Sequence, residues 1–232
     1  MGVPFIDLSA QQAEIAAEVE PAVLDVLRRA AFIGGPEVAG FEAEYAAFLG
    51  VAHCVGVANG TDAVELALRA VGVEPGGEVI MPANTFIATA EAASRIGAIP
   101  VPVDVDPEYL LIDPDAVAAA ITPRTQAIVP VHLFGQVAPV ERLDAIAAAH
   151  GLPIVEDAAQ SQGAERLGRR AGTLGRVSAT SFYPGKNLGA SGDGGAVMTD
   201  DAAAADFVRL MGGHGSKIKY RHEIVGVNSR LD

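Results

Sequence analysis

The sequence predicts a single α/β domain in which helices cover both faces of a doubly wound, mostly parallel sheet. Short apolar runs alternate with helical patterns along most of the chain, and such βα alternation is typical of parallel sheets. Several of the runs are apolar at nearly every position, as strands are when both faces of a sheet are covered. The chain of 232 residues is also long enough to bury one large core.

The expected elements begin with an N-terminal helical region at about 9–49, interrupted at Pro21 and at the Gly-Gly-Pro segment 34–36. Glycines at 72, 97 and 151 then mark the ends of three helices. Strands are predicted at 53–58, 78–81, 99–103, 127–131, 153–156, 178–183 and 196–199, and helices at 61–71, 85–96, 114–121, 140–150 and 201–211.

The composition excludes several classes of function. A formal net charge of −13 argues against nucleic acid or an anionic membrane as the main partner. The five histidines are dispersed, with no ligand pair at helical spacing, which argues against a metal site. The single cysteine, Cys54, is typical of a reducing compartment. Because no secretory signal and no membrane-spanning apolar run is visible, we expect a cytoplasmic protein.

Polar residues recur just after the predicted strands. In open α/β sheets, ligands bind beyond the carboxyl ends of the strands, so these residues are expected to share one site. They are Asn59-Gly60-Thr61, Asn84-Thr85-Phe86, His132, Asp157 and the loop that carries Lys186.

The segments 154–160 (IVEDAAQ) and 181–189 (SFYPGKNLG) carry the most specific chemistry. The first is an apolar strand that ends in an acid, and the second is a strand that opens into a loop with Lys186, one of only three lysines. Such a lysine suits a covalent bond to the aldehyde of pyridoxal 5'-phosphate (PLP), and Asp157 suits the protonated pyridine nitrogen. Glu156 should point away from Asp157 if the strand alternation persists.

Gly60, Thr61 and Asp62 begin a helix directly after a strand. Backbone N–H groups at a helix N-terminus favour an anion, so this turn is a candidate phosphate site. Taken alone, Asn-Gly-Thr is equally an ordinary turn and helix cap.

Around these residues the sequence resembles the DegT/DnrJ/EryC1/StrS family, the PLP-dependent aminotransferases of nucleotide-linked keto-sugars. The resemblance extends over the whole chain. It rests on VPFIDL at 3–8, FIGGP at 32–36, ANGTDA at 58–63, PANTF at 82–86, PVHLFG at 130–135 and GVNSRLD at 226–232, besides the two segments above.

The resemblance implies a role for each matching residue. Lys186 and Asp157 would be catalytic, Phe86 would stack on the cofactor ring, and Gln160 would lie near the ring hydroxyl. Ser181 would bind the phosphate with Gly60, Thr61 and Asp62, and Asn228 would reach the phosphate of a neighbouring subunit, which implies a homodimer with shared active sites. Substrate contacts are assigned to Tyr183, Lys219 and Tyr220.

The implied reaction moves an amino group from L-glutamate to a nucleotide-linked keto-sugar. The segment 216–222 (SKIKYRH) looks most like the branch that aminates C3 of dTDP-linked 3-keto-6-deoxyhexoses. The family continues into a small C-terminal domain, so residues 1–232 are expected to be the PLP-binding large domain, including the N-terminal helical segment.

Other interpretations stay open at this point. The enzyme alternatives are a relative that acts on a cyclitol ketone and an aminobenzoate synthase, and a different class is a catalytically inert cofactor-binding fragment. Individually, Lys186 is also compatible with a solvated loop, Asp157 with a helix cap, Gln160 with a turn and Phe86 with a core aromatic. The basic and aromatic residues at 217–222 are equally compatible with a solvated loop.

Overall fold

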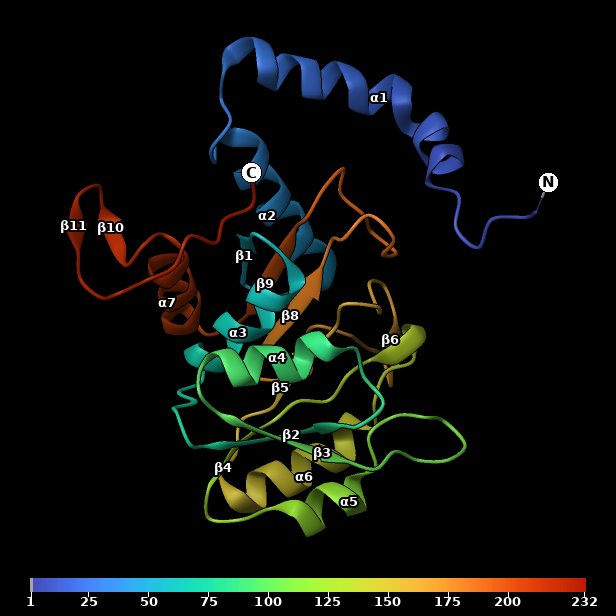
Figure 1. The fold of residues 1–232 in the computed structure, drawn as a ribbon, viewed down its shortest axis with the longest axis vertical. Helices are drawn as coiled ribbons and strands as arrows, with labels where there is room; N and C mark the ends of the chain where they lie inside the picture. Colours follow the sequence, from blue (N-terminus) through green and yellow to red (C-terminus); the bar gives the residue numbers. More distant parts are fainter. Residues whose placement is uncertain (1) are drawn as a thin grey trace.

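A computed structural model describes residues 2–232 of the chain (Figure 1). Its helices are α1 (Leu8–Arg29), α2 (Pro36–Leu49), α3 (Gly60–Ala70), α4 (Ile87–Arg95), α5 (Pro114–Ala120), α6 (Val140–His150) and α7 (Ala202–Gly212), with the short 3₁₀ turn η1 (Leu133–Gly135). Its strands are β1 (His53–Val57), β2 (Glu78–Pro82), β3 (Ile99–Val103), β4 (Thr125–Ile128), β5 (Val155–Asp157), β6 (Glu165–Arg166), β7 (Arg169–Arg170), β8 (Val177–Ser181), β9 (Gly195–Thr199), β10 (Ser216–Ile218) and β11 (Arg221–His222).

The central strands lie in the order β3-β2-β4-β5-β8-β9-β1. Hydrogen-bonded ladders join β3-β2-β4 and β5-β8-β9-β1, and parallel bridges from Ile128 to Ile154 and from Val131 to Asp157 connect the two groups. Only β9 pairs antiparallel with its neighbours, β1 and β8. The predicted mostly parallel sheet is therefore confirmed.

Helices cover both faces of this sheet, as the near-continuous apolar strands predict. Alternate strand residues such as Val79, Val155 and Val197 pack in one core cluster with buried residues of α3, α4 and α7. Their neighbours on the other face pack against α5 and α6 in a second cluster, and against α2 in a third. The fold is thus doubly wound, and its parallel strands, all central strands except β9, present their carboxyl ends at one edge.

Two local expectations are corrected by the structure. α1 continues without a break through Pro21, although we expected an interruption there. Proline removes one helical hydrogen bond, but its φ is already close to the helical value, and helix-forming residues surround it. Strand β4 ends at Ile128 rather than at 131, because Pro130 has no N–H to donate to a ladder.

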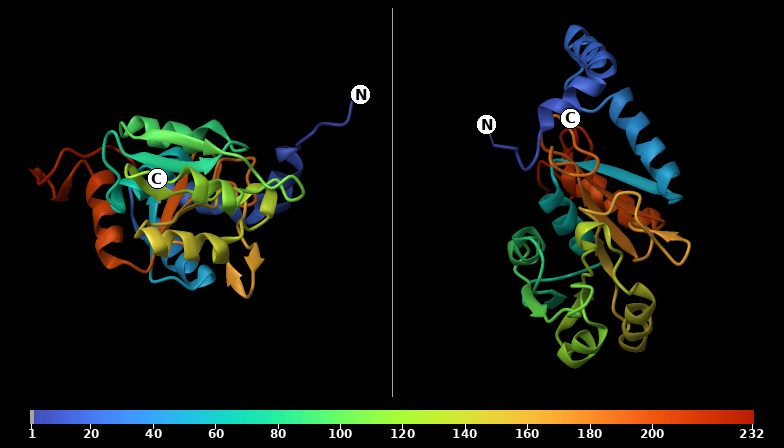
Figure 2. Two further views of the ribbon diagram at one scale, coloured as in Figure 1. Left: turned by 90° about the horizontal axis from the view of Figure 1, so that it is seen from below. Right: turned by 90° about the vertical axis from the view of Figure 1, so that its right-hand side faces the viewer.

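Two segments extend away from the sheet: in Figure 1 one lies across the top of the molecule and the other projects to the left, and both also stand out in Figure 2. One is the N-terminal segment with α1, of whose residues none is buried. The other is the β10–β11 hairpin, whose turn residue Tyr220 is 82% exposed. Within residues 2–232, no helix has the length and apolar character needed to cross a bilayer.

Candidate cofactor site

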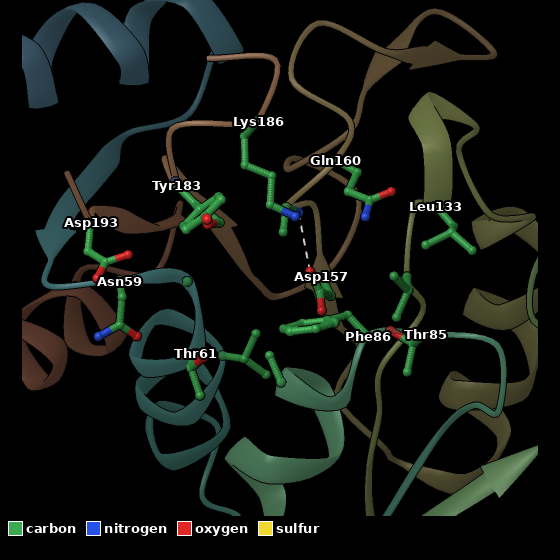
Figure 3. A pocket seen from close by; sticks show the side chains of 16 residues that line it. Asn59, Thr61, Thr85, Phe86, Leu133, Asp157, Gln160, Tyr183, Lys186 and Asp193 are labelled. Carbon is green, nitrogen blue, oxygen red and sulfur yellow. Dashed lines mark hydrogen bonds between the residues drawn. The ribbon is translucent and has the colours of Figure 1, made fainter. Parts of the chain in front are cut away.

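A cavity of about 450 Å³ opens at the carboxyl edge of the sheet (Figure 3). This volume lies within the range of roughly 300–1,000 Å³ that is usual for small-molecule sites. Its walls come from the ends of β5 and β8, the N-termini of α3 and α4, and the loops after β2, β4 and β8. The predicted site residues that line it are Gly60, Thr61, Phe86, Asp157, Gln160, Ser181, Tyr183 and Lys186.

Lys186 reaches the cavity from a tight turn after β8. The turn is closed by a hydrogen bond from the Lys186 N–H to the Tyr183 carbonyl (2.8 Å). Gly189 packs closely against the backbone of Pro184, and a Cβ at position 189 would be 2.4 Å from the Pro184 carbonyl oxygen. This position of the loop therefore needs glycine. The amino group points toward the Asp157 carboxylate (Figure 3). Burial lowers the pKa of Lys186 below its ordinary value, and the charge of Asp157 offsets part of that effect.

Asp157 is the last residue of β5 and is 6% exposed. Both carboxylate oxygens have partners: Oδ2 accepts from the Thr89 hydroxyl (2.7 Å) and Oδ1 from the Ala159 N–H (3.2 Å). Backbone bonds to Pro130 (2.9 Å) and from the His132 N–H (3.0 Å) attach this strand end to the loop after β4. The carboxylate is therefore held in one orientation facing the cavity.

Glu156 points to the other face of the sheet, as the alternation predicts, and is fully buried. Its carboxylate accepts four hydrogen bonds, from His132 Nε2 and from the N–H groups of Gly172, Leu174 and Gly175. His132 Nδ1 accepts from the Ala138 N–H (3.1 Å), so the proton of the ring is on Nε2. Burial alone raises the pKa of Glu156, but these hydrogen bonds outweigh it and lower the pKa below its ordinary value.

The N-terminus of α3 offers unpaired backbone donors to the cavity. The Asn59 side chain accepts from the Asp62 N–H (2.8 Å), and the Ala63 N–H bonds to the Asn59 carbonyl (3.0 Å). Among residues 2–232, the N–H groups of Gly60 and Thr61 have no hydrogen-bond partner. Ser181 lies beside them, since a Cβ on Gly60 would be 2.5 Å from its Cβ. This arrangement suits a phosphate group.

Three further side chains have functional groups directed at the same space. Phe86 is 67% exposed and lies beside Asp157 (Figure 3), so its ring is free to cover a flat ligand. Gln160 Oε1 accepts from the Phe134 N–H (3.0 Å), which leaves its NH₂ group as a donor. Tyr183 is 58% exposed on the cavity wall.

The structure does not bring every predicted site residue into this cavity. The Asp62 carboxylate pairs with Arg95 (3.0 Å) instead of lining it. Asn228 is exposed and bridges Gly213 at the end of α7. Lys219 and Tyr220 lie on the projecting hairpin, with the Lys219 ammonium 5.2 Å from the Tyr220 ring centre. In residues 2–232 no group of three or more His, Cys, Asp or Glu side chains is arranged to hold a metal.

Four polar residues at or beside the cavity were not assigned roles from the sequence. Asn59 and Thr85 follow strands in the predicted pattern, which was the available signal. Asp193 approaches from the glycine-rich loop before β9, and no spacing connects it with the other residues. Thr89 is buried on α4, where a threonine in an apolar helix gives no sign of its partner.

The residues therefore provide what PLP requires. Lys186 supplies an amine with a lowered pKa, Asp157 supplies a fixed carboxylate, and the N–H groups of Gly60 and Thr61 supply unpaired donors, all around one cavity.

Comparisons with known proteins identify a family of aminotransferases. The sequence model of the DegT/DnrJ/EryC1/StrS aminotransferase family matches residues 13–232. The erythromycin biosynthesis sensory transduction protein EryC1 of Saccharopolyspora erythraea is 53% identical over 232 residues, which are all of this chain and 63% of EryC1. A dTDP-3-amino-3,4,6-trideoxy-alpha-D-glucose transaminase of Streptomyces venezuelae is 51% identical over 230 residues, or 99% of this chain and 61% of the relative.

Among solved structures, the crystal structure of S. venezuelae DesV in complex with a ketimine intermediate superimposes with a TM-score of 0.96. It is 51% identical, and the match covers 99% of this chain and 62% of DesV. The chain thus spans somewhat less than two thirds of the length of the proteins that it matches.

Proposed function

The chain belongs to the DegT/DnrJ/EryC1/StrS aminotransferase family, and we propose that it forms the cofactor domain of a PLP-dependent sugar aminotransferase. One observation carries this proposal: the Lys186 amino group points toward the Asp157 carboxylate in a cavity that is also lined by Gly60 and Thr61, whose N–H groups are unpaired. PLP, when bound, supplies a ring that accepts electrons from the amino-bearing carbon.

Each residue then has a defined task. Lys186 would hold the cofactor aldehyde and, when free, its amine would accept and return the proton of the amino-bearing carbon. Asp157 would keep the ring nitrogen protonated through a charge-assisted hydrogen bond. Phe86 would cover one ring face, and the NH₂ group of Gln160, which is left free because Oε1 accepts from the Phe134 N–H, would donate to the ring oxygen. The contacts with the phosphate are assigned to Gly60, Thr61 and Ser181. Asp62 is left out of this set, because its N–H already donates to Asn59 Oδ1 and its carboxylate pairs with Arg95.

We propose L-glutamate as amino donor and a nucleotide-linked keto-sugar, specifically a dTDP-3-keto-6-deoxyhexose, as acceptor. The name of the S. venezuelae relative, a transaminase of a dTDP-3-amino sugar, supports this choice. The proposed cofactor contacts do not select a ring carbon, so amination at C3 is compatible with them. Specificity is attributed to Tyr183, which lines the cavity, and to the exposed Lys219 and Tyr220, which a second subunit would supply in the proposed dimer.

The homodimer is part of the same proposal. Asn228, Lys219 and Tyr220 lie outside the cavity of their own chain but on exposed segments, as residues that complete a neighbour's site must be. Mixing Lys186→Ala with Asn228→Ala subunits should restore activity through hybrid sites. Failure of the mixture to regain activity, with exchange of subunits verified, would reject the shared site.

The cofactor assignment is tested by borohydride reduction of the protein after incubation with PLP. Peptide mapping should locate the reduced adduct on Lys186. An adduct found only on Lys217 or Lys219, the other two lysines, would reject the assignment.

The substrate is tested by comparing kcat/KM for a dTDP-3-keto-6-deoxyhexose and the matching 4-keto sugar, with glutamate as donor. The 3-keto sugar should be preferred. Preference for the 4-keto sugar or for a cyclitol ketone would reject the C3 assignment and leave the PLP site intact, and PLP binding without any turnover would identify an inert cofactor-binding fragment.

A further inference from the structure

Thr89 is a buried residue of α4 whose side chain is hydrogen-bonded to Asp157 in the candidate cofactor site. It is the third residue of that helix and is 1% exposed. Its hydroxyl lies 2.7 Å from Asp157 Oδ2 and 3.0 Å from the Thr85 hydroxyl, and Thr85 lines the cavity. Thr89 itself does not line the cavity, so it contacts the proposed chemistry only through these two neighbours.

The direction of these hydrogen bonds follows from counting protons. An ionised carboxylate only accepts, so the Thr89 hydroxyl must donate its single proton to Asp157. The Thr89 oxygen is then available only as an acceptor, and the Thr85 hydroxyl must donate to it. The result is a directed series, from Thr85 to Thr89 to Asp157, in which each bond polarises the next.

This series restrains the carboxylate from one side, while the Ala159 N–H restrains the other oxygen. Rotation of the carboxylate about its Cβ–Cγ bond would break the short bond to Thr89 and leave a buried hydroxyl unpaired, which is costly. Oδ2 therefore keeps one lone pair on Thr89 and presents its other lone pair in a fixed direction.

We infer that Thr89 is a positioning residue that orients Asp157 toward the cofactor ring nitrogen, with Thr85 completing the series at the cavity wall. The inference rests on the proposed function and deepens it. It differs from a purely structural role, in which Thr89 only satisfies its own hydroxyl and its loss affects stability alone.

The test compares PLP affinity in three variants of this chain, measured by equilibrium dialysis, with thermal unfolding of each cofactor-free protein. Thr89→Val removes the hydroxyl at nearly constant shape, and Thr89→Ser retains it. Thr199→Val is the matched control, because the buried Thr199 hydroxyl also donates one bond (to the Arg176 carbonyl, 2.8 Å) and accepts one (from the Asp201 N–H, 3.0 Å), away from the cavity.

Thr89→Val should raise the Kd for PLP by about tenfold or more, as expected for loss of a hydrogen bond to a charged group. Thr89→Ser should remain close to wild type, and Thr199→Val should lower the unfolding temperature without changing the Kd. In turnover with glutamate, Thr89→Val should lower kcat more than it raises KM, because the electron-accepting ring is affected more than substrate binding.

The inference would be overturned if Thr89→Val left the Kd for PLP unchanged. It would also be overturned if Thr89→Ser or Thr199→Val weakened PLP binding as much as Thr89→Val does. These results are distinct from failure of the proposed function, in which the wild-type chain itself binds no PLP and the inference falls with it.

Discussion

Glu156 and Asp157 are adjacent on β5, yet their carboxylates lie on opposite faces of the sheet and have different surroundings. Glu156 is fully buried and accepts four hydrogen bonds from protein groups, whereas Asp157 accepts two and faces the cavity. A carboxylate whose lone pairs are all used within the protein is suited to a structural role. A carboxylate with remaining acceptor capacity is suited to a ligand.

Replacing Asp157 with alanine should separate binding from chemistry. The N–H groups of Gly60 and Thr61 remain, so we expect some PLP to be retained, while kcat for transamination falls by about a hundredfold or more. PLP binding by dialysis and turnover with glutamate measure the two effects. Turnover near the wild-type level would show that another acid serves the ring nitrogen.

Replacing Glu156 with glutamine should destabilise the fold by about 3–5 kcal/mol at neutral pH, because buried donors lose their charged acceptor. The exposed pair of Glu141 with Arg166 provides a control, and Glu141→Gln should cost less than about 1 kcal/mol. Urea unfolding measures both variants. Similar losses in the two variants would contradict the structural role of Glu156.

The effect of Glu156 should also depend on pH. Its folded-state pKa is lowered, so its contribution is fully present above the unfolded value of about 4.3 and is lost as pH falls through the folded value. The stability difference between wild type and Glu156→Gln should therefore shrink below about pH 4. A difference that stays constant down to the folded pKa would show that the ionised form is not what stabilises the protein.

Lys186 should titrate below the ordinary lysine pKa of about 10.4 in the cofactor-free protein. Burial disfavours its charged form, and Asp157 partly opposes this, so Asp157→Asn should lower the pKa of Lys186 further. NMR titration of ¹³C-methylated lysines, assigned with Lys186→Arg, provides the measurement. An ordinary pKa in wild type, or a rise in Asp157→Asn, would contradict this account.

Gly60→Ala should destabilise the protein by about 1–3 kcal/mol, because the added methyl group would overlap Ser181. Gly40 is the control, since it also lies within a helix but has nothing within 4 Å of an added Cβ. Gly40→Ala should therefore stabilise by about 0.5–1 kcal/mol. Equal effects of the two substitutions in thermal unfolding would show that the contact with Ser181 is not restrictive.

Much of the fold was predictable because its strands are short, apolar and separated by clear helix ends. The helix at 140–150 was predicted with its observed bounds, and most other elements within two residues. The β6–β7 and β10–β11 hairpins were not predicted, because strands of two or three mostly polar residues are too short to show a periodicity. The continuity of α1 at Pro21 was also not predicted. The expectation that proline interrupts a helix does not take into account the helix propensity of the residues on either side of it.

The cavity residues were predictable where a residue ends a strand, as Asp157 does, or lies in the loop after one, as Phe86 does, because such positions converge at one edge of the sheet. The hydrogen-bond partners were not. The bond of Thr89 to Asp157 joins residues 68 positions apart. The pairing of Asp62 with Arg95 likewise depends on how α3 packs on α4.

The order of the strands has a consequence for the nascent chain. β1 is the first central strand to leave the ribosome, but its sheet partner is β9, the last one, so β1 remains without its ladder until residue 199 has been made. Helix α3, which follows β1, begins at Gly60, whose neighbour Ser181 is also synthesised late. Loop closure over such separations is slow and leaves apolar strands exposed meanwhile. Newly made chains should therefore acquire affinity for PLP only as a late event, which links cofactor capture to completion of the sheet.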